Sequence, residues 1–264
     1  MSINKIFNLS NKVIILTGAA GLLGTEYAHG LSQAGANVVL ADLNFDKCKK
    51  LSLNLNKKYN VNSFPIKLDV TKINSINTMI KQVIKKFSKI DILINNAIFS
   101  EAGHDKMTFE DYDLDIWKKG LNVNLSGVFL CCQEVGKIMK KQKTGNIINI
   151  SSIYGIVSPD QRIYGNTKII KSSMYAVTKS GILNFTRYLA SYWSQDGIRV
   201  NTLSLGGVEE NQNSTFKKNY SNKTMIGRMA KKDEYVGALI FLSSNASSYM
   251  TGSNLVIDGG WTAW

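Results

Sequence analysis

The sequence predicts an α/β fold in which a doubly wound, seven-stranded parallel sheet carries helices on both faces. Short runs rich in valine and isoleucine alternate with longer amphipathic stretches along all 264 residues. Apolar strands separated by helices are typical of parallel sheets that are buried on both faces. Because no internal repeat, low-complexity segment or Pro/Gly/Ser-rich linker divides the chain, we expect residues 1–264 to form a single domain.

The predicted elements follow one another in a regular order. The strands are the apolar runs at residues 13–16, 38–41, 64–68, 90–94, 146–150, 200–204 and 255–257. The helices are the amphipathic stretches at residues 22–34, 46–59, 73–87, 113–140, 174–193 and 233–242. Three segments, at residues 99–111, 155–173 and 206–229, are expected to be loops that follow strands. Substrate contacts should come from them, because ligands of such sheets bind at the carboxyl ends of the strands.

The chain is basic, with 32 lysine and arginine residues against 19 acidic residues and a net charge of +13. Nucleic-acid binding is one interpretation of this excess. The lysines, however, occur singly or in pairs, and no long basic run is interleaved with aromatic residues. A basic surface without a nucleic-acid partner is therefore the favoured interpretation, while attraction of an anionic substrate remains open.

Several function classes are disfavoured by what the sequence lacks. No apolar run approaches the roughly 20 residues that a membrane helix needs, and the first residues show no secretory signal. Three cysteines, Cys48, Cys131 and Cys132, form no C-x-x-C pair, and no cluster with metal-ligand spacing is visible. We therefore expect a protein of the reducing cytoplasm, without a membrane partner and without a metal.

A glycine-rich turn, T-G-A-A-G-L-L-G at residues 17–24, follows the first predicted strand and opens a predicted helix. Gly18, Gly21 and Gly24 permit a tight turn and a close approach of the backbone to a pyrophosphate. The helix that begins near Leu22 and Leu23 supplies N–H groups and the positive end of its dipole. The context predicts a dinucleotide-binding site, and with it a Rossmann fold.

Asp42 ends the next predicted strand, 18 residues after Gly24. A carboxylate near this offset binds the hydroxyls of the adenosine ribose and repels a 2′-phosphate. No arginine stands in the glycine turn or directly after Asp42. The sequence thus favours NAD over NADP as cofactor, against the alternative that Asp42 is a solvated acid at the end of a strand.

Tyr175 and Lys179 lie four residues apart in Y-A-V-T-K, and Ser152 lies upstream at the end of an apolar run. Residues four apart share one face of a helix, so the phenol and the ammonium can point into one pocket. A cation beside a phenol lowers its pKa, which suits proton exchange with a carbonyl oxygen near neutral pH. A lone Y-x-x-x-K is a weak signal, but its combination with a dinucleotide turn is a strong one.

Together these residues resemble the short-chain dehydrogenase/reductase family, and the resemblance covers nearly the whole chain. It is greatest for bacterial members associated with flagellin and surface-sugar (nonulosonate) modification. The motifs are T-G-A-A-G-L-L-G at Thr17, L-D-V at Leu68, N-N-A at Asn95, V-N-L-S-G at Val123, I-S-S at Ile150, Y-A-V-T-K at Tyr175, I-R-V-N at Ile198 and T-G-S-N-L-V-I-D-G-G at Thr251.

The resemblance implies a catalytic tetrad. Tyr175 would be the acid/base, and Lys179 would lower its pKa and hold the nicotinamide ribose. Ser152 would bind the substrate oxygen, and Asn124 would hold a water that links Lys179 to solvent. Besides Asp42 and the glycine turn, the implied cofactor contacts are Leu43, Asp69, Val70, Asn96, Ala97 and Val208.

The sequence departs from the family pattern at several positions. Leu22 replaces a glycine of compact members, a spacing that resembles the nucleotide-sugar branch of the family. Ile98 follows N-N-A where a glycine is usual, and Leu205 replaces a proline. Ser152 and Tyr175 are 23 positions apart, more than in most relatives, so Ser151 or Ser173 could take the place of Ser152.

The predicted activity is NAD(P)-dependent hydride transfer between a nicotinamide and a carbonyl or secondary alcohol of a sugar or sugar-derived anion. The alternatives are an NAD-dependent sugar epimerase or isomerase and a non-catalytic NAD-binding regulator. The resemblance also implies a homodimer or homotetramer, packed through the helix that carries Tyr188 and Tyr192.

Basic and aromatic side chains in the expected loops could bind an anionic substrate, although solvated lysines explain them equally well. His104 could also reach the pocket, although a surface histidine is the favoured interpretation. The candidate substrate residues are Tyr154, Arg162, Tyr164, Lys168, Lys171, Phe216, Lys217, Lys218, Tyr220 and Arg228.

Overall fold

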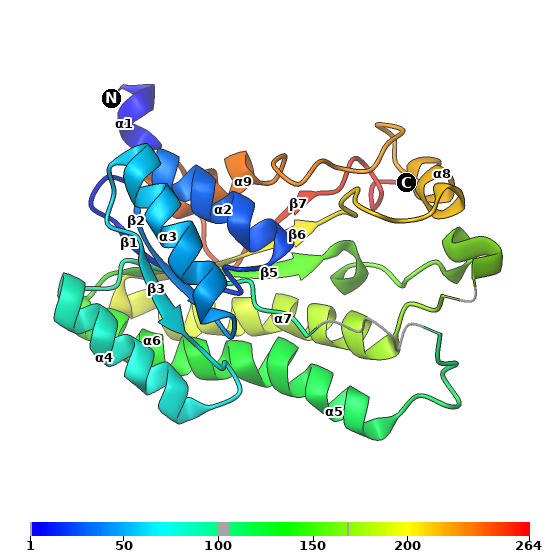
Figure 1. The fold of residues 1–264 in the computed structure, drawn as a ribbon, viewed down its shortest axis with the longest axis horizontal. Coiled ribbons are helices and arrows are strands. Elements are labelled where there is room, and N and C mark those ends of the chain that lie inside the picture. Colours follow the sequence, from blue (N-terminus) through cyan, green and yellow to red (C-terminus); the bar gives the residue numbers. More distant parts are fainter. Residues whose placement is uncertain (1, 100–105, 168) are drawn as a thin grey trace.

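The computed structural model describes residues 2–99, 106–167 and 169–264, and these contain the predicted seven-stranded parallel sheet (Figure 1). The strands stand in the order β3-β2-β1-β4-β5-β6-β7. Every predicted strand is confirmed to within two residues at each end. The bounds are β1 (Val13–Thr17), β2 (Asn37–Asp42), β3 (Phe64–Lys67), β4 (Ile92–Asn95), β5 (Gly145–Ser152), β6 (Ile198–Leu205) and β7 (Asn254–Ile257).

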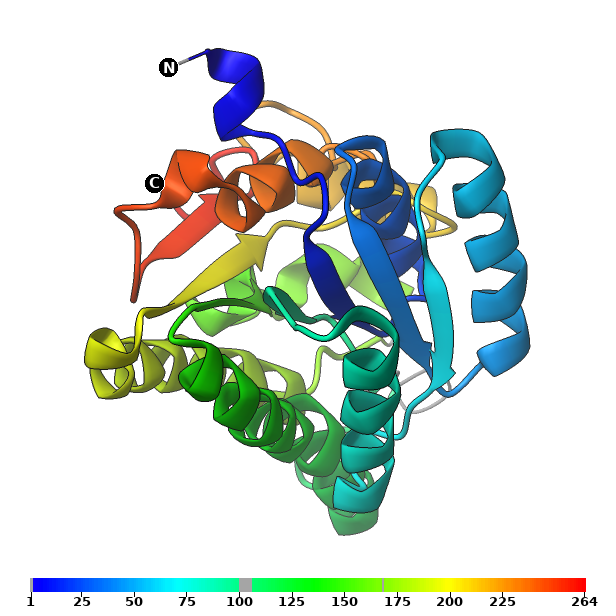
Figure 2. The ribbon, with the colours of Figure 1, turned by 90° about the vertical axis from the view of Figure 1, so that its left-hand side faces the viewer.

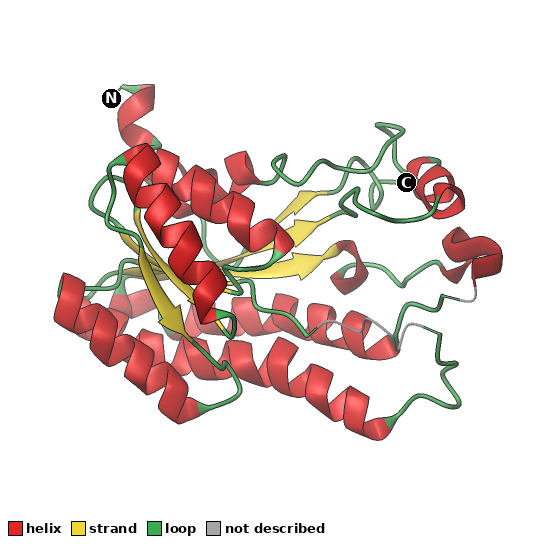
Figure 3. Ribbon diagram, in the orientation of Figure 1, coloured by secondary structure: helices red, strands yellow, loops and turns green. Residues whose placement is uncertain are grey.

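Helices cover both faces of the sheet, as Figures 2 and 3 show. Side chains of β1 alternate between the two layers: Val13 and Ile15 join one core cluster, and Ile14 and Leu16 join the other. The first cluster includes α4 (Ile73–Phe87), α6 (Gly127–Gln142) and α7 (Ser173–Tyr192). The second includes α2 (Leu22–Gln33), α3 (Phe45–Tyr59) and α9 (Val236–Ser243). The doubly wound α/β fold is therefore confirmed.

The helix predicted at residues 113–140 is wrong as a single element. The structure has α5 (Leu114–Leu121), one π-helical turn η1 (Asn122–Ser126) and then α6. Asp113 caps α5 by accepting the N–H groups of Asp115 and Ile116. A π turn inserts one residue into the helical repeat, and such turns are frequent at functional sites; this one contains Asn124.

Two segments expected to be loops contain short helices. The segment at residues 155–173, here called the insertion, contains the 3₁₀ segment η3 (Gln161–Thr167), and residues 206–229 contain α8 (Ser214–Ser221). Both lie beyond the carboxyl ends of the strands, at the same end of the molecule as the C-terminus (Figure 1). The remaining short elements are α1 (Ile3–Ile6), η2 (Ile153–Gly155), η4 (Ser194–Asp196) and η5 (Asn245–Ser247).

A third apolar cluster joins the insertion to the α8 region. It includes Tyr164 of the insertion and Tyr220 of α8, together with Tyr154 of η2 and Trp261 near the C-terminus. Burial of these aromatic side chains favours the docked arrangement of the two segments. The sheet edge that binds ligands in this architecture is therefore walled by two segments far apart in sequence.

None of the helices in the described part of the chain combines the length and the apolar character that crossing a bilayer requires. All three cysteines are buried and carry free thiols. Burial raises the pKa of the Cys131 thiol to about 12, so this side chain behaves as a small apolar core residue.

Candidate active site

The glycine turn joins β1 to α2, and its backbone is packed so closely at Gly18 and Gly24 that a side chain cannot be accommodated at either position. Gly18 has a φ of +67°, and a Cβ there would lie 2.8 Å from the Cα of Ala97. A Cβ on Gly24 would lie 2.1 Å from the carbonyl oxygen of Gly18. The helix begins after Gly21, its N-cap residue. Its first N–H groups have no partner within the helix, which makes this end suitable for an anionic phosphate.

Asn96 and Ala97 lock this turn to the end of β4. The side-chain amide of Asn96 donates to the carbonyl oxygens of Thr17 and Gly18, both at 3.1 Å. The backbone N–H groups of Asn96 and Ala97 donate to the hydroxyl of Thr17 at 3.0 and 3.1 Å. These two residues thus fix the shape of the turn.

Asp42 ties the glycine turn to the turn after β2. One carboxylate oxygen accepts the N–H of Ala20 at 3.0 Å, and the other accepts the N–H of Asn44 at 2.9 Å. The carboxylate therefore keeps a fixed place at the carboxyl end of β2. An acid fixed in this way supplies a defined acceptor for ribose hydroxyls.

Several of the predicted adenosine contacts line one small cavity at the carboxyl ends of the strands. Its lining includes Gly18, Asp42, Leu43, Asp69, Val70 and Ala97. Leu43 is 64% exposed, which leaves its side chain available to cover a ligand. Ile98 belongs both to this cavity and to a larger one beside it, so the two spaces adjoin. Glycines without room for a Cβ, a free helix N-terminus and a fixed carboxylate together fit a nicotinamide dinucleotide.

The larger cavity contains three of the four predicted catalytic residues. It has a volume of about 280 Å³, and Ser152, Tyr175 and Lys179 all line it. Tyr175 and Lys179 lie one turn apart on α7, with the Lys179 ammonium 5.7 Å from the centre of the Tyr175 ring. Val208, the predicted nicotinamide contact, and Leu23 of α2 line the same cavity.

Lys179 is buried, with 5% of its surface exposed. Its ammonium donates to the carbonyl oxygen of Ile150 at 2.9 Å. Burial, and then the positive charge of Lys171, lower its pKa to about 8. The group therefore still carries its proton at neutral pH, although more weakly than an exposed lysine.

The structure distinguishes the three candidate serines. The Ser151 hydroxyl donates to the carbonyl oxygen of Lys179 at 2.9 Å, which commits it to holding β5 against α7. Ser173 lines a separate groove at the start of α7. Ser152 accepts the N–H of Tyr154 at 3.2 Å, which leaves its O–H as a donor at the cavity wall. Ser152 is thus the serine best placed to meet a substrate oxygen.

Asn124 lies in η1 and does not line the larger cavity. It is 1% exposed, and its side-chain oxygen accepts the N–H of Phe99 at 2.8 Å. Its amide nitrogen lies 3.6 Å from the sulfur of Met174, the residue before Tyr175. The structure therefore places Asn124 against the start of α7, behind the other three residues.

The insertion and α8 supply the outer wall of the larger cavity. Tyr164 and Lys171 contribute from the insertion, Tyr154 from η2 directly before it, and Phe216 and Tyr220 from α8. The rings of Tyr164 and Phe216 lie 5.1 Å apart between centres. Of the lining residues, Gln212 and Met229 were not singled out from the sequence, because neither type signals a binding role in a segment without periodicity.

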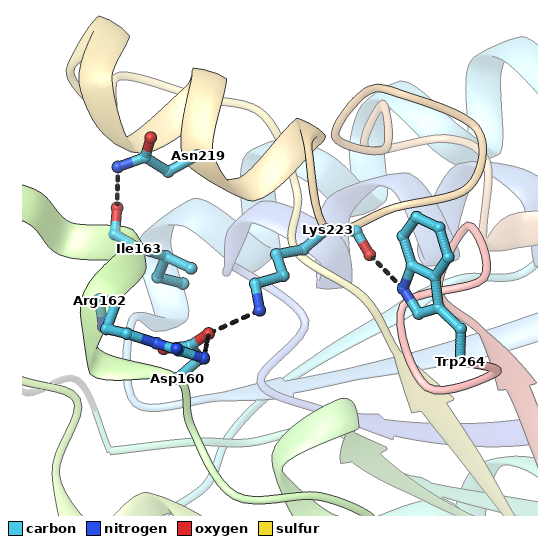
Figure 4. A network of polar contacts seen from close by, with 6 residues as sticks. All are labelled: Asp160, Arg162, Ile163, Asn219, Lys223 and Trp264. Carbon is cyan, nitrogen blue, oxygen red and sulfur yellow. Dashed lines mark hydrogen bonds and ion pairs between the residues drawn. The ribbon is translucent and has the colours of Figure 1, made fainter.

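Polar contacts fasten the insertion to the α8 region (Figure 4). The Asp160 carboxylate pairs with Arg162 and with Lys223, each at 2.8 Å. The amide of Asn219 donates to the carbonyl oxygen of Ile163 at 3.1 Å. The indole N–H of Trp264 donates to the carbonyl oxygen of Lys223 at 3.1 Å. The Asp160–Lys223 pair and the Asn219–Ile163 bond cross between the insertion and the α8 region and supplement the apolar packing there. The Trp264 bond joins the C-terminus to the α8 region.

The other candidate substrate residues that the structure describes do not line the larger cavity. Arg162 is paired with Asp160, Lys217 with Glu209 and Arg228 with Glu234. Lys218 is exposed. His104 and Lys168 lie outside the described residues.

Known proteins resemble this chain in sequence and in fold. A family model described as "Enoyl-(Acyl carrier protein) reductase" matches residues 18–262. The post-translational flagellin modification protein A of Campylobacter coli is 34% identical over 96% of this chain and 99% of its own length. A sorbose reductase of Candida albicans is 32% identical over 97% of this chain and 89% of its own length. The crystal structure of a gluconate 5-dehydrogenase from Burkholderia cenocepacia, in complex with NADP and tartrate, is also similar. It superposes on this chain over the full length of both chains, with 28% identity and a TM-score of 0.89. These matches agree with the doubly wound sheet, the glycine turn and the Tyr175–Lys179 pair, and the chain belongs to the short-chain dehydrogenase/reductase family.

Proposed function

We propose that this protein is an NAD-dependent oxidoreductase that interconverts a carbonyl and a secondary alcohol in a small, sugar-type substrate. The observation that carries the proposal is the common cavity of Ser152, Tyr175 and Lys179 beside the glycine turn. A hydroxyl donor, a phenol and a buried ammonium are the groups that proton transfer to a reacting oxygen requires.

When bound, the nicotinamide exchanges a hydride with the substrate carbon. In the reductive direction, Tyr175 donates its phenolic proton to the oxygen that becomes the hydroxyl. Ser152 donates a hydrogen bond to the same oxygen, which stabilises the negative charge that develops there. The Lys179 ammonium, held by the carbonyl of Ile150, favours the phenolate that Tyr175 leaves behind. The oxidative direction reverses these roles.

Asn124 is proposed to hold the water that links Lys179 to solvent. Its place in a π turn that packs against α7 supports this role. Because its side-chain oxygen is engaged by Phe99 and its amide faces Met174, it also positions the start of the helix that carries Tyr175.

The proposed cofactor contacts follow the two cavities. Asp42 and Leu43 would hold the adenosine ribose, with Asp69 and Val70 at the adenine and Asn96 and Ala97 along the same side. The helix end from Gly21 to Gly24, with Leu22 and Leu23, would face the pyrophosphate. Val208, Tyr175 and Lys179 would hold the nicotinamide end.

We propose NAD rather than NADP because of the fixed carboxylate of Asp42. A 2′-phosphate beside it would be repelled, and the turn D-L-N-F after β2 offers no lysine or arginine to offset that repulsion. The related gluconate 5-dehydrogenase was solved with NADP, so a direct comparison of both cofactors is needed.

A sugar-type substrate is supported by relatives and by the cavity. One relative is named a sorbose reductase and another a gluconate 5-dehydrogenase. The cavity wall combines the aromatic side chains of Tyr154, Tyr164 and Tyr220 with polar groups, a lining that suits a small polyhydroxylated molecule. An epimerase or isomerase that retains its cofactor is the second candidate, favoured by Leu22 in the glycine spacing.

The outer face of α6 and α7 is proposed to bind a second copy of the chain. Phe129, Tyr188 and Tyr192 are all about half exposed or more on these neighbouring helices, and they border an apolar groove. Exposed aromatic patches of this kind mark protein interfaces. Light scattering of the purified protein tests this proposal: we expect the mass of a dimer or a tetramer, and the mass of a monomer would contradict it.

The test is a comparison of the wild-type protein with Tyr175→Phe. Absorbance of the reduced nicotinamide is followed with NAD and NADP over a panel of sugars, sugar alcohols and sugar acids. We expect Tyr175→Phe to lower kcat by about 10²- to 10⁴-fold while NAD still binds in a calorimetric titration. Tyr249→Phe, which changes a fully exposed tyrosine outside the larger cavity, is the matched control and should keep its activity. Undiminished turnover in Tyr175→Phe would refute the mechanism.

A further inference from the structure

We propose that Tyr220 of α8 is a positioning residue, which fixes the backbone of Gly207 and so couples the nicotinamide end of the cofactor site to the docking of α8. The inference rests on the proposed function and deepens it, since it concerns how the same site is held in shape. It follows from the hydrogen bonds around residues 206–208 and from the packing of the Tyr220 ring.

The segment that follows β6 forms part of the wall of the larger cavity. Gly206, Gly207 and Val208 all line this cavity, and Val208 is the proposed contact of the nicotinamide. The hydroxyl of Tyr235 donates to the carbonyl oxygen of Gly206 at 2.9 Å. The N–H of Ala230 donates to the carbonyl oxygen of Gly207 at 3.0 Å. Residues that come shortly before α9 thus hold the carbonyl groups of this segment.

α8 holds the same segment through one phenol hydroxyl. Tyr220 is 2% exposed and is the one buried residue of α8, and its hydroxyl accepts the N–H of Gly207. A Cβ on Gly207 would lie 2.7 Å from the ring carbon that bears this hydroxyl. The phenol can therefore reach the backbone only because residue 207 has no side chain.

The environment of Tyr220 favours a structural hydrogen bond over acid–base chemistry. Burial raises the pKa of the Tyr220 phenol, so the group is neutral at neutral pH and exchanges its proton less readily than an exposed tyrosine. Removal of its oxygen would leave the N–H of Gly207 without this acceptor at the cavity wall, which is costly for a buried donor. Tyr220 is therefore expected to act through the backbone that it holds.

The position of the Tyr220 ring depends in turn on how α8 is docked. The ring stacks on Trp261 near the C-terminus, with 4.4 Å between the ring centres. The neighbouring residue, Asn219, donates from its side-chain amide to the carbonyl oxygen of Ile163 in the insertion at 3.1 Å (Figure 4). The contacts of α8 with the insertion and with the C-terminal segment thus set where the hydroxyl meets Gly207.

The experiment compares two ligands that differ by the nicotinamide alone. The Kd values of NAD and of ADP-ribose, which lacks the nicotinamide, are measured by calorimetry for wild type and for Tyr220→Phe. This variant keeps the ring and its packing but removes the oxygen. Tyr27→Phe is the matched control: it also removes a buried tyrosine hydroxyl, but one that has no hydrogen-bond partner in the described part of the chain and lies outside the larger cavity.

Without the hydroxyl, Gly207 is free to turn its N–H toward water, and binding of the nicotinamide must then restore the original backbone. A smaller binding-competent fraction raises the Kd in proportion. We expect the ratio of the Kd for NAD to the Kd for ADP-ribose to rise about tenfold in Tyr220→Phe. The Kd for ADP-ribose should stay within about twofold of wild type, which also shows that the variant is folded. Tyr27→Phe should keep the wild-type ratio, and an unchanged ratio in Tyr220→Phe overturns the inference.

A second variant tests the coupling to α8 and does not depend on the folding of Tyr220→Phe. Asn219→Ala removes the bond to Ile163 and leaves Tyr220 in place. It should raise the same ratio about threefold in the wild-type background and add little in the Tyr220→Phe background, where the connecting hydroxyl is already absent. No rise in the wild-type background, or an equal rise in both backgrounds, overturns the coupling.

Failure of the proposed function would look different. If wild type binds both ligands and the ratio does not respond to Tyr220→Phe, the positioning role alone is overturned. If the ratio responds but no sugar, sugar alcohol or sugar acid leads to reduction of NAD, the result supports the role of Tyr220 and counts against the proposed oxidoreductase activity. A wild-type protein that binds neither ligand would overturn both.

Discussion

The buried ammonium of Lys179 makes the stability of the protein depend on pH in a way that one substitution can isolate. Its pKa falls from 10.5 to about 8 on folding, mainly because the group is buried. Between these two values the unfolded chain holds the proton and the folded chain has released it. The free energy of unfolding therefore gains a contribution that rises with pH over this window and is flat below pH 8.

The size of this contribution follows from the two pKa values. Each pH unit within the window is equivalent to about 1.4 kcal/mol, so the whole change is roughly 3 kcal/mol. No reduction for solvent screening is needed, since Lys179 is almost fully buried. A change of that size is a large fraction of the stability of an ordinary domain.

The assay is urea unfolding of the cofactor-free protein at a series of pH values from 7 to 10.5. Other lysines and tyrosines titrate here too, so the informative quantity is the difference between wild type and Lys179→Met. We expect that difference to be constant near pH 7 and then to shift in favour of wild type as the pH rises above 8. Lys171→Met should reduce the effect, because the pKa of Lys179 rises when its neighbouring charge is removed. A difference that is flat across the range would refute the reasoning.

Two further predictions concern the cofactor. Asp42→Asn removes the negative charge but keeps one acceptor oxygen, so the ratio of kcat/KM for NAD to kcat/KM for NADP should fall about tenfold or more. Asp46→Asn, which changes an exposed acid, is the control. An unchanged ratio in Asp42→Asn contradicts the assignment of Asp42 to the ribose. Gly24→Ala places a methyl group 2.1 Å from the carbonyl oxygen of Gly18, which should displace the turn at a cost of about 1–3 kcal/mol and abolish NAD binding in calorimetry. Gly237→Ala, where an added Cβ meets nothing within 4 Å, should bind NAD normally, and retained binding in Gly24→Ala would show that the turn is not the cofactor site.

The sheet could be predicted from sequence because its signal is local. Buried parallel strands are short runs of branched apolar residues, and each run stands out between polar stretches. The helix at Ile73–Phe87 was predicted with its observed bounds, because its apolar residues repeat at helical spacing. Tertiary contacts were not needed for either assignment.

The helical features that were predicted wrongly from the sequence depend on non-local contacts. An extra residue in η1 leaves the apolar pattern of residues 113–140 continuous, so the sequence predicted one helix. The eight residues of α8 bury only Tyr220, and a polar stretch with one buried side chain has no helical periodicity to detect. Its helix is stabilised by docking against the insertion.

In the candidate site, too, some residues could be predicted from the sequence and others could not. Tyr175 and Lys179 could be paired from their spacing, and the structure places Ser152 in the same cavity. The sequence could not distinguish Lys171 from Arg162, since both are basic residues of one irregular segment. The three-dimensional structure shows that Lys171 lines the cavity, whereas Arg162 lies outside it and pairs with Asp160.

The bond from the Ser151 hydroxyl to the carbonyl of Lys179 has a consequence for protein engineering. It joins the end of β5 directly to the middle of α7, and Gly155 packs so tightly there that a Cβ would lie 2.6 Å from the same carbonyl oxygen. The spacing between Ser152 and the Tyr175–Lys179 pair is thus set by strand-to-helix packing, whatever the length of the chain that connects them. Exchange of residues 156–171 should therefore redirect substrate choice while Ser152, Tyr175 and Lys179 keep their present spacing. Ser172 stays, because its hydroxyl accepts the N–H of Tyr175 at 3.3 Å, and loss of Lys171 should raise the pKa of Lys179.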